Sequence, residues 1–329
     1  MRQSEWHGKP YYSLDAWCKN TLSRKCYKIA LNAHMTCPNR DGTLGTQGCI
    51  FCSAGGSGDF AVDNAEKSMD AQLSEGLARL HAKFSPDKNA CLIAYFQAYT
   101  NTYAPVPYLR QIYTEALSCP WVCGISIATR PDCLPHEAIQ LLTELRQLYP
   151  DKFIWIELGL QTIHEQTAAF IRRGYALSCF EEAFARLTEA DIPVIVHLIL
   201  GLPGETSEMM LQSVRYLNPF RPFGVKLQLL HILRDTDLGA LYLAQQSDPA
   251  ALSGPFALRP LEQDDYLDIL IACIRNLSPE IVIHRLTGDG PRKNLLAPLW
   301  SLDKRNVLNT LHRQMRTLNA IQGDLYHNI

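Results

Sequence analysis

The chain has 329 residues, of which 47% are hydrophobic. This composition can bury the core of one large α/β domain or of two modest ones, and it excludes a small peptide-like scaffold. The formal net charge of −2 gives by itself no reason to expect a nucleic-acid partner. The charge is unevenly distributed, because residues 1–41 and residues 284–329 each carry seven Lys and Arg against three Asp and Glu, which leaves the middle net negative by ten. Basic ends can form a patch for a polyanion if the fold brings the termini together, although ordinary solvated charge explains them as well.

The sequence shows no sign of secretion or of membrane insertion. Its start lacks the apolar run of a signal peptide, and the most apolar stretch, "IPVIVHLILGLPG", is too short and too rich in Gly and Pro to span a bilayer. Eleven cysteines in such a chain favour free thiols and metal ligands over a disulfide framework. We therefore expect a cytoplasmic protein without a membrane partner.

Short β-branched or aromatic runs alternate with longer amphipathic runs through the first two thirds of the chain. The expected strands are 26–32, 91–97, 122–128, 153–160, 194–200 and 225–230. The expected helices are 64–83, 107–118, 135–149, 164–173, 178–190 and 207–217. This alternation predicts a parallel sheet with right-handed crossovers, and six such units form an open, partial (βα)6 barrel.

The regular alternation of predicted strands and helices ends after Leu230. A helix is expected over 261–277, a strand and loop over 280–292, and a last helix over 301–318. We therefore expect a core barrel over residues 1–235, including the N-terminal segment, and a C-terminal α/β extension over 236–329 that packs on it.

Segments with unusual composition follow five of the predicted strands. They are, in order, "CPNRDGTLGTQGCIFC", "FQAYTNTY", "ATRPD", "ELGLQT" and "LGLPGET". Parallel βα folds place their chemistry at the carboxyl ends of the strands. Each segment alone is consistent with an ordinary loop, but five on one rim predict a functional site there.

The first of these loops carries three cysteines, Cys37, Cys49 and Cys52, spaced C-x11-C-x2-C. Cys49 and Cys52 have the spacing of a zinc knuckle, but a structural zinc site needs four ligands, and His34 is the nearest candidate for the fourth. The alternative is an iron–sulfur cluster in which three thiolates bind three irons. The fourth iron then stays open for S-adenosylmethionine (SAM), a cofactor of radical chemistry.

These motifs resemble the YtqA/YhcC family of bacterial radical SAM proteins, which is similar to the radical SAM domain of the Elongator catalytic subunit. The resemblance rests on the cysteine loop with "SAGGSGDFA", and on "YFQAYTNTYAP", "ISIATRPDCL", "ELGLQT" and "HRLTGDGP". It implies a partial radical SAM barrel, a [4Fe-4S] cluster and bound SAM. It also implies an enzyme that cleaves SAM to methionine and a 5'-deoxyadenosyl radical, which abstracts a hydrogen from the substrate.

The resemblance further implies roles for individual residues. Cys37, Cys49 and Cys52 match the ligands of the cluster, and Arg173 is expected to reach the SAM carboxylate or the adjoining helix, with a plain helix-end cation as the alternative. The other residues expected to meet SAM are Phe51, Gln97, Thr129, Arg130, Glu157, Gln161, Gly201 and Gly204. Independently of the resemblance, the candidates for proton transfer after hydrogen abstraction are Asp132, His284, Asp289 and Tyr103, with structural or surface polar residues as the alternative.

For the substrate, the Elongator resemblance and the basic flanks favour tRNA, and in particular the side chain of a wobble uridine. Lys304, Arg305, Arg313 and Arg316 recur along the last predicted helix, where several can share one face and contact phosphates. The same helix also carries a stripe of apolar residues of the kind that docks a helix on the protein core (the docking stripe). Its charges are therefore equally consistent with a solvated face. A small-molecule or peptide substrate and a non-catalytic, zinc-containing nucleic-acid-binding protein remain alternatives. A radical SAM enzyme also needs an electron donor such as flavodoxin or ferredoxin.

Eight cysteines lie outside the loop. Cys119 and Cys123 are the only close pair among them, and their place at the entry to the third strand suits core packing better than a second cluster. Cys133, just after "TRPD", lies on the expected active rim but is equally consistent with a buried thiol.

Overall fold

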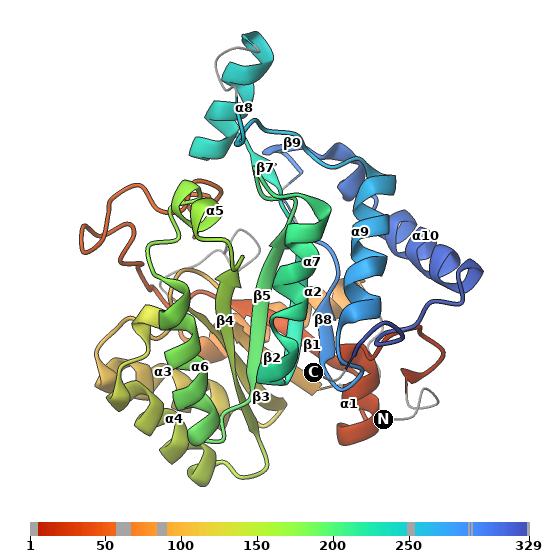
Figure 1. Cartoon of the computed structure of the whole chain (residues 1–329). Helices are drawn as coiled ribbons and strands as arrows, with labels where there is room; N and C mark the ends of the chain where they lie inside the picture. The colour runs from red at the N-terminus through yellow and green to blue at the C-terminus, as the bar shows by residue number, and fades with distance from the viewer. Residues whose placement is uncertain are drawn as a thin grey trace.

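The computed structural model describes residues 6–56, 67–83, 91–248, 254–288, 290 and 292–327. Its centre is a seven-stranded parallel sheet that curls into a half barrel (Figure 1), with the strand order β1-β2-β3-β4-β5-β6-β8. The strands are β1 (Cys26–Leu31), β2 (Cys91–Phe96), β3 (Val122–Thr129), β4 (Phe153–Gln161), β5 (Val194–Leu200), β6 (Gly224–Leu229) and β8 (Val282–Arg285).

Helices that follow the strands cover the outer face of this sheet. They are α2 (Met69–Lys83), α3 (Val106–Ser118), α4 (His136–Leu148), α6 (Leu177–Glu189), α7 (Ser207–Arg215), α9 (Gln263–Asn276) and α10 (Lys304–Thr317), whereas the short helix α5 (Glu165–Phe170) lies beyond the carboxyl end of β4. Their apolar stripes join the outward-facing strand residues in one large core. On α6, for example, Phe180, Ala183, Phe184 and Leu187 are buried at helical spacing. Each fully buried side chain of this size contributes about 1.5 to 3 kcal/mol to the free energy of unfolding.

The predicted partial barrel is confirmed, and each of its six strands lies within one residue of its expected bounds. The sheet nevertheless has a seventh strand, because β8 pairs in parallel with β6. This strand comes from the predicted C-terminal extension, so the extension completes the sheet in addition to packing on it. Residues 64–66, at the start of the expected second helix, lie outside the described residues.

Four further elements were not among the expected ones. Helix α1 (Leu14–Leu22) precedes the barrel, helix α8 (Asp237–Ser247) follows it, and β7 (Ile232–Leu233) forms a small antiparallel sheet with β9 (Leu295–Ala297). In the described part of the chain, every helix is too short or too polar to cross a membrane.

The two ends of the described chain lie side by side (Figure 1). This proximity is the condition under which the basic ends of the sequence can form a common patch. Backbone hydrogen bonds join Gln322 to Pro10 at 2.9 Å, and the backbone amide of Tyr12 donates to the side chain of Gln322 at 2.9 Å. Nearby, the hydroxyl of Tyr11 lies 3.1 Å from Nε2 of His312 on α10.

Helix α1 closes the amino-terminal end of the barrel. Its cap residue Ser13 accepts a hydrogen bond from the amide of Ala16, which satisfies one of the free donors at the helix start. From this helix Trp17 packs edge-on against Phe153, Trp155 and Phe223, with ring centroids 5.1 to 5.9 Å apart. Such aromatic pairs add to the stabilisation that burial alone provides.

We expect the replacement Trp17→Ala to lower the free energy of unfolding by about 3 kcal/mol, because it removes a large ring from this cluster and leaves a cavity. Denaturant-induced unfolding measures the change. Trp121→Ala is the matched control, since Trp121 is 41% exposed and its loss should change stability by less than about 0.5 kcal/mol. Equal costs for the two variants would contradict this account of the barrel end.

Candidate active site

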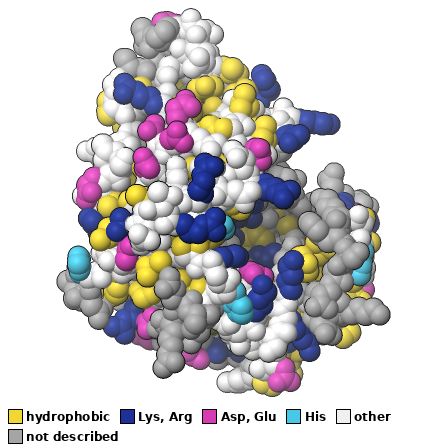
Figure 2. Space-filling view, turned by 90° about the vertical axis from the view of Figure 1, so that its right-hand side faces the viewer, with side chains coloured by type: hydrophobic (Ala, Val, Ile, Leu, Met, Phe, Trp, Pro, Cys, Tyr) yellow, Lys and Arg dark blue, Asp and Glu magenta, His cyan; other side chains and the backbone are white. Residues whose placement is uncertain are grey.

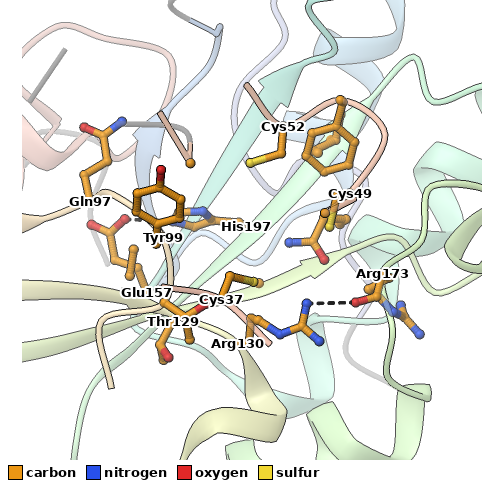
Figure 3. Close-up of a pocket in the computed structure, with 18 of the residues that line it drawn as sticks. Cys37, Cys49, Cys52, Gln97, Tyr99, Thr129, Arg130, Glu157, Arg173 and His197 are labelled. Atoms are coloured by element: carbon orange, nitrogen blue, oxygen red, sulfur yellow. Dashed lines mark hydrogen bonds and ion pairs between the residues drawn. The ribbon is translucent and has the colours of Figure 1, made fainter. Parts of the chain in front are cut away.

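A cavity with about 1040 Å³ of empty space, part of it open to solvent, lies at the carboxyl ends of the strands (Figure 3). The sequence-predicted residues that line it are Cys37, Cys49, Phe51, Cys52, Gln97, Thr129, Arg130, Glu157, Gln161 and Arg173. They come from the cysteine loop, from β4, from the ends of β2 and β3, and from the turn after α5, so the tertiary structure brings together residues as far apart in the chain as Cys37 and Arg173.

The cysteine loop is fixed to its surroundings by side chains within it. The amide nitrogen of Asn39 donates to the carbonyl of Arg172 at 2.8 Å and lies 3.6 Å from Sγ of Cys49. The guanidinium of Arg40 donates to the carbonyls of Cys52 and Ser53 at 2.8 and 2.6 Å. These bonds hold the three thiols, which are all partly exposed, on one side of the cavity (Figure 3).

The spacing of the loop thiols favours a cluster over a single metal ion. In the described part of the chain, one group of three Cys, His, Asp or Glu residues has its ligand atoms within 4.8 Å of one another. This group does not include the loop cysteines. Around a single zinc ion, with zinc–sulfur distances near 2.3 Å, the sulfurs would lie about 3.8 Å apart. The three loop thiols are too widely spaced for that arrangement, whereas an iron–sulfur cluster separates its thiolates with the metal atoms between them.

Positive charge surrounds these thiols. Of the described residues that line the cavity, Arg40, Arg130, Arg173 and Arg285 are basic and Glu157 is the only acidic one. Burial and the neighbouring Cys52 raise the pKa of Cys49 to about 12, whereas Arg130 acts to lower it. Cationic neighbours favour thiolates and anionic ligands. Figure 2 shows a hollow on one face of the molecule with dark blue Lys and Arg side chains around it.

Arg130 and Arg173 hold the chain next to the cysteine loop in place through hydrogen bonds. Arg130 binds both carboxylate oxygens of Asp132 at 2.9 and 2.7 Å, and it donates to the carbonyl of Arg173 at 3.0 Å (Figure 3). The side chain of Arg173 is 1% exposed and donates to the carbonyls of Leu160, Thr162 and Tyr175 and to both oxygens of Glu165. Of the two expected roles for Arg173, these contacts support the one toward the adjoining helix α5.

A buried ionic network forms the floor of the cavity. Glu157, fully buried on β4, accepts hydrogen bonds from Lys28 and Ser126 on one oxygen, both at 2.5 Å. Its other oxygen accepts from His197 at 2.7 Å and from Lys226. Glu157 was predicted to contact SAM, but both of its carboxylate oxygens already accept hydrogen bonds from side chains within the barrel.

The charges of this network determine its protonation states. Burial by itself would raise the pKa of Glu157, but the ammonium groups of Lys226 and Lys28 outweigh burial and hold it well below its ordinary value. Burial, with Lys226 adding to it, lowers the pKa of His197 to about 4. At neutral pH the carboxylate is therefore ionised, while His197 is neutral and donates its Nε2 proton to Glu157.

The remaining predicted site residues lie outside the residues that line this cavity. Gly201 and Gly204 have φ of 86° and 82°, which favour glycine, and they line a second cavity beside the first. Tyr103 contacts the cysteine loop, where its hydroxyl lies 2.9 Å from that of Thr43. His284 is buried against the rings of Trp155 and Phe223. Asp289 lies outside the described residues.

Several lining residues were not expected from the sequence. They include Arg40, Tyr95, Tyr99, Tyr175, His197, Gln228 and Arg285. The hydroxyl of Tyr175 donates to Gln161 at 2.9 Å. A sequence signal existed for the ionic network, since Lys28, His197 and Lys226 each interrupt an otherwise apolar strand. Charged residues are rarely buried unless they are paired, so such an interruption indicates a polar lumen.

The low pKa of His197 predicts a specific dependence of stability on pH. In the unfolded chain this residue binds a proton near pH 6.5, whereas in the folded chain it does so only near pH 4, so stability is complete above pH 6.5 and is lost as the pH falls toward 4. Between pH 7.5 and 5 the wild-type free energy of unfolding should fall by about 2 kcal/mol more than that of His197→Gln, which retains a donor to Glu157. Parallel pH profiles of the two proteins in denaturant unfolding would show this explanation to be wrong.

Comparison with known proteins identifies the fold and the family. The model of the radical SAM superfamily matches residues 42–217, and that of the radical SAM C-terminal domain matches residues 222–317. The solved structure of Methanocaldococcus infernus Elp3 with an N-terminal deletion superposes with a TM-score of 0.63 at 14% identity, over 90% of this chain and 64% of that one.

Sequence relatives agree with this assignment. Protein YtqA of Bacillus subtilis is 37% identical over 98% of this chain and 94% of its own, and protein YhcC of Escherichia coli is 33% identical over 91% and 90%. The tRNA uridine(34) acetyltransferase of Methanocaldococcus jannaschii is a distant relative, 27% identical over 38% of this chain and 23% of its own. The cofactors of such proteins are a [4Fe-4S] cluster and SAM, and the arginine-rich cavity with its three widely spaced thiols fits both. The chain belongs to the radical SAM superfamily and, within it, to a YtqA/YhcC-like family that is distantly related to Elp3.

Proposed function

We propose that this radical SAM enzyme modifies the side chain of a wobble uridine in tRNA. The observation that carries the proposal is the open, arginine-rich cavity beside the three loop cysteines, which offers space and positive charge for an extruded nucleotide. The distant relationship to a protein named tRNA uridine(34) acetyltransferase and to Elp3 supports the same substrate class.

In this proposal Cys37, Cys49 and Cys52 hold the [4Fe-4S] cluster. The bound cluster, once reduced, supplies the electron that splits SAM into methionine and a 5'-deoxyadenosyl radical. The protein's own task is to position the reactants and to exclude water. Phe51 provides an aromatic face for adenine. The other residues proposed to contact SAM from the cavity are Gln97, Thr129, Arg130 and Gln161, whereas Arg173 lines the cavity and holds helix α5.

Tyr103, His284 and Asp289 remain the candidates for proton transfer, and Gly201 and Gly204 the candidates for close backbone approach to SAM. In the described structure Tyr103 is the nearest of these to the loop, through Thr43. The buried ring of His284 would need access to the cavity to act, because it packs against Trp155. Gly201 and Gly204 would act from the second cavity.

The basic face of α10 supports a contact with RNA. Val307, Leu311 and Met315 are buried as the docking stripe of this helix, whereas Arg313 and Arg316 on its opposite side are exposed. Neither arginine forms an ion pair with another described residue. Exposed arginines of this kind bind phosphates without reading sequence. Lys304 and Arg305 at the start of α10, and the basic N-terminal flank beside it, extend the same surface.

A flavodoxin or a ferredoxin is the proposed electron donor, and the cytoplasm is the proposed location. A small molecule or a peptide is the second candidate substrate, since the cavity is open to solvent.

The cluster assignment predicts that Cys37→Ala, Cys49→Ala and Cys52→Ala each abolish iron binding by the loop after anaerobic reconstitution. The wild-type protein should carry about four irons and should cleave SAM after reduction, because three thiolates complete the protein's share of the cluster. Iron analysis and chromatography of 5'-deoxyadenosine measure both. Cys179→Ala is the control, since this partly exposed thiol lies on α6 outside the cavity. Full iron binding by the loop variants would refute the assignment.

The substrate assignment predicts weaker tRNA binding by the double variant Arg313→Ala/Arg316→Ala. We expect a loss of about tenfold in affinity at low salt and a fall of about two in the salt slope, because two phosphate contacts disappear. The control is Arg110→Ala/Arg146→Ala, which removes two charges from α3 and α4 on the other side of the molecule (Figure 1).

Mass spectrometry of tRNA nucleosides from cells with and without the gene then identifies the product. The substrate is a small molecule or a peptide under the following combination of results. The wild-type protein binds iron and cleaves SAM, the double variant binds tRNA as tightly as the wild type, and cells without the gene have unchanged tRNA nucleosides.

A further inference from the structure

Three other cysteines meet at the end of the barrel opposite the cavity. Cys26 and Cys91 are the first residues of β1 and β2, and they lie directly opposite each other in the sheet. Cys123 is the second residue of β3 and lies where the register between β2 and β3 shifts, so that it has no partner on β2. An extra residue of this kind forms a β-bulge, which re-aims its side chain.

The sulfur atoms of this trio converge. All three Sγ atoms lie within 4.8 Å of one another, and those of Cys26 and Cys91 are 3.3 Å apart. Because Cys26 and Lys28 share one face of β1, and Lys28 bonds to Glu157 in the lumen, the trio also faces the lumen, below the ionic network. Cys37 and Cys26 are separated by the whole of β1, about 20 Å of strand, so the trio is distinct from the loop site.

The surroundings of the trio are apolar on one side and open on the other. Cys26 and Cys123 pack on the aromatic cluster that contains Trp17. Cys91 and Cys123 line a surface cavity together with Arg24, Thr21 and Lys152 at the end of α1 and the start of β4. An ion from solvent can therefore reach thiols that are otherwise enclosed.

We propose that Cys26, Cys91 and Cys123 bind one Zn²⁺ ion as a trithiolate site, with water from the surface cavity as the fourth ligand. Thiolates select soft cations such as Zn²⁺ and Cu⁺ over harder ions. Zinc–sulfur distances near 2.3 Å place the sulfurs about 3.8 Å apart, which the present spacing allows with small adjustments. Zn²⁺ leaves one net negative charge on three thiolates, which the neighbouring Arg24 can balance, whereas Cu⁺ would leave two.

A metal ion binds to thiolates, so binding at this site requires the loss of thiol protons. Hydrogen bonds to Cys26 and Cys91, together with burial, raise the pKa of Cys123 far above its ordinary value. A zinc ion displaces these protons and links the three sulfurs.

Such a site has a structural role that does not depend on the substrate of the enzyme. It joins the amino ends of β1, β2 and β3, the strands whose carboxyl ends lead into the cysteine loop, Gln97 and Arg130. A metal ion that holds these three strands together therefore also stabilises the positions of the cavity residues that follow them.

The test measures metals in the full-length protein after anaerobic loading of the iron–sulfur cluster, with zinc sulfate as the added metal. Elemental analysis should find about one zinc per chain beside the cluster iron, and X-ray absorption at the zinc edge should find three sulfur ligands near 2.3 Å. Cys123→Ala should weaken zinc binding at least about 100-fold while the iron content stays the same. Zinc should raise the midpoint of thermal unfolding of the wild-type protein but not of this variant.

Cys119→Ala is the matched control, because Cys119 is a buried thiol four residues away that does not belong to the trio. It should leave zinc binding unchanged. Copper at the same three sulfurs, seen at the copper edge, would overturn the choice of zinc and assign the site to Cu⁺. Three results would overturn the site itself: no metal beyond the cluster iron, equal zinc binding by wild type and Cys123→Ala, or a disulfide between Cys26 and Cys91 in freshly purified protein.

Discussion

The carboxylate of Glu157 is the interaction on which the interior of the barrel depends. It is fully buried on β4, and side chains from the other five predicted strands surround it: Lys28, Tyr95, Ser126, His197 and Lys226, from β1, β2, β3, β5 and β6. An isolated charge at this depth would be expensive to desolvate, and removing one partner from a buried ion pair typically costs about 3 to 5 kcal/mol. Because each strand contributes one group to a common centre, the network also fixes the relative heights of the strands, and with them the loops at their carboxyl ends.

This centre accounts for the electrostatic character of the cavity above it. Lys28 and Lys226 face the one carboxylate of the floor, although burial holds the pKa of Lys226 well below its ordinary value, and four arginines add positive charge along the walls. Such a cavity suits anionic groups: the thiolates of a cluster, the carboxylate of SAM and the phosphates of a nucleotide. The arginines do not all serve a ligand directly. Arg173 uses its donors to hold the end of β4 to α5, and Arg130 in turn holds the backbone of Arg173, so the walls are stiff before any ligand binds.

The two sets of three cysteines show how spacing separates two kinds of metal chemistry. Cys37, Cys49 and Cys52 belong to one loop, line an open cavity and are too far apart for a single ion. Cys26, Cys91 and Cys123 belong to three adjacent strands and lie as close together as a single ion requires. The predicted core packing of Cys123 is confirmed, since it packs on the aromatic cluster. Its other neighbours could not be foreseen, because they lie on different strands and a bulge sets its direction.

The sequence by itself determined the order of strands and helices, the half-barrel class and the loop that carries the cluster cysteines. These features are local: hydrophobic period, turn residues and the spacing of Cys37, Cys49 and Cys52 are each contained within a short stretch of chain. The tertiary structure alone decided which distant residues meet. It placed β8 of the C-terminal extension beside β6, gathered the Glu157 network and the Cys26 trio, and turned Arg173 toward α5. Those contacts depend on strand register and on one bulge, and a shift of a single residue along a strand reverses the face on which every side chain lies.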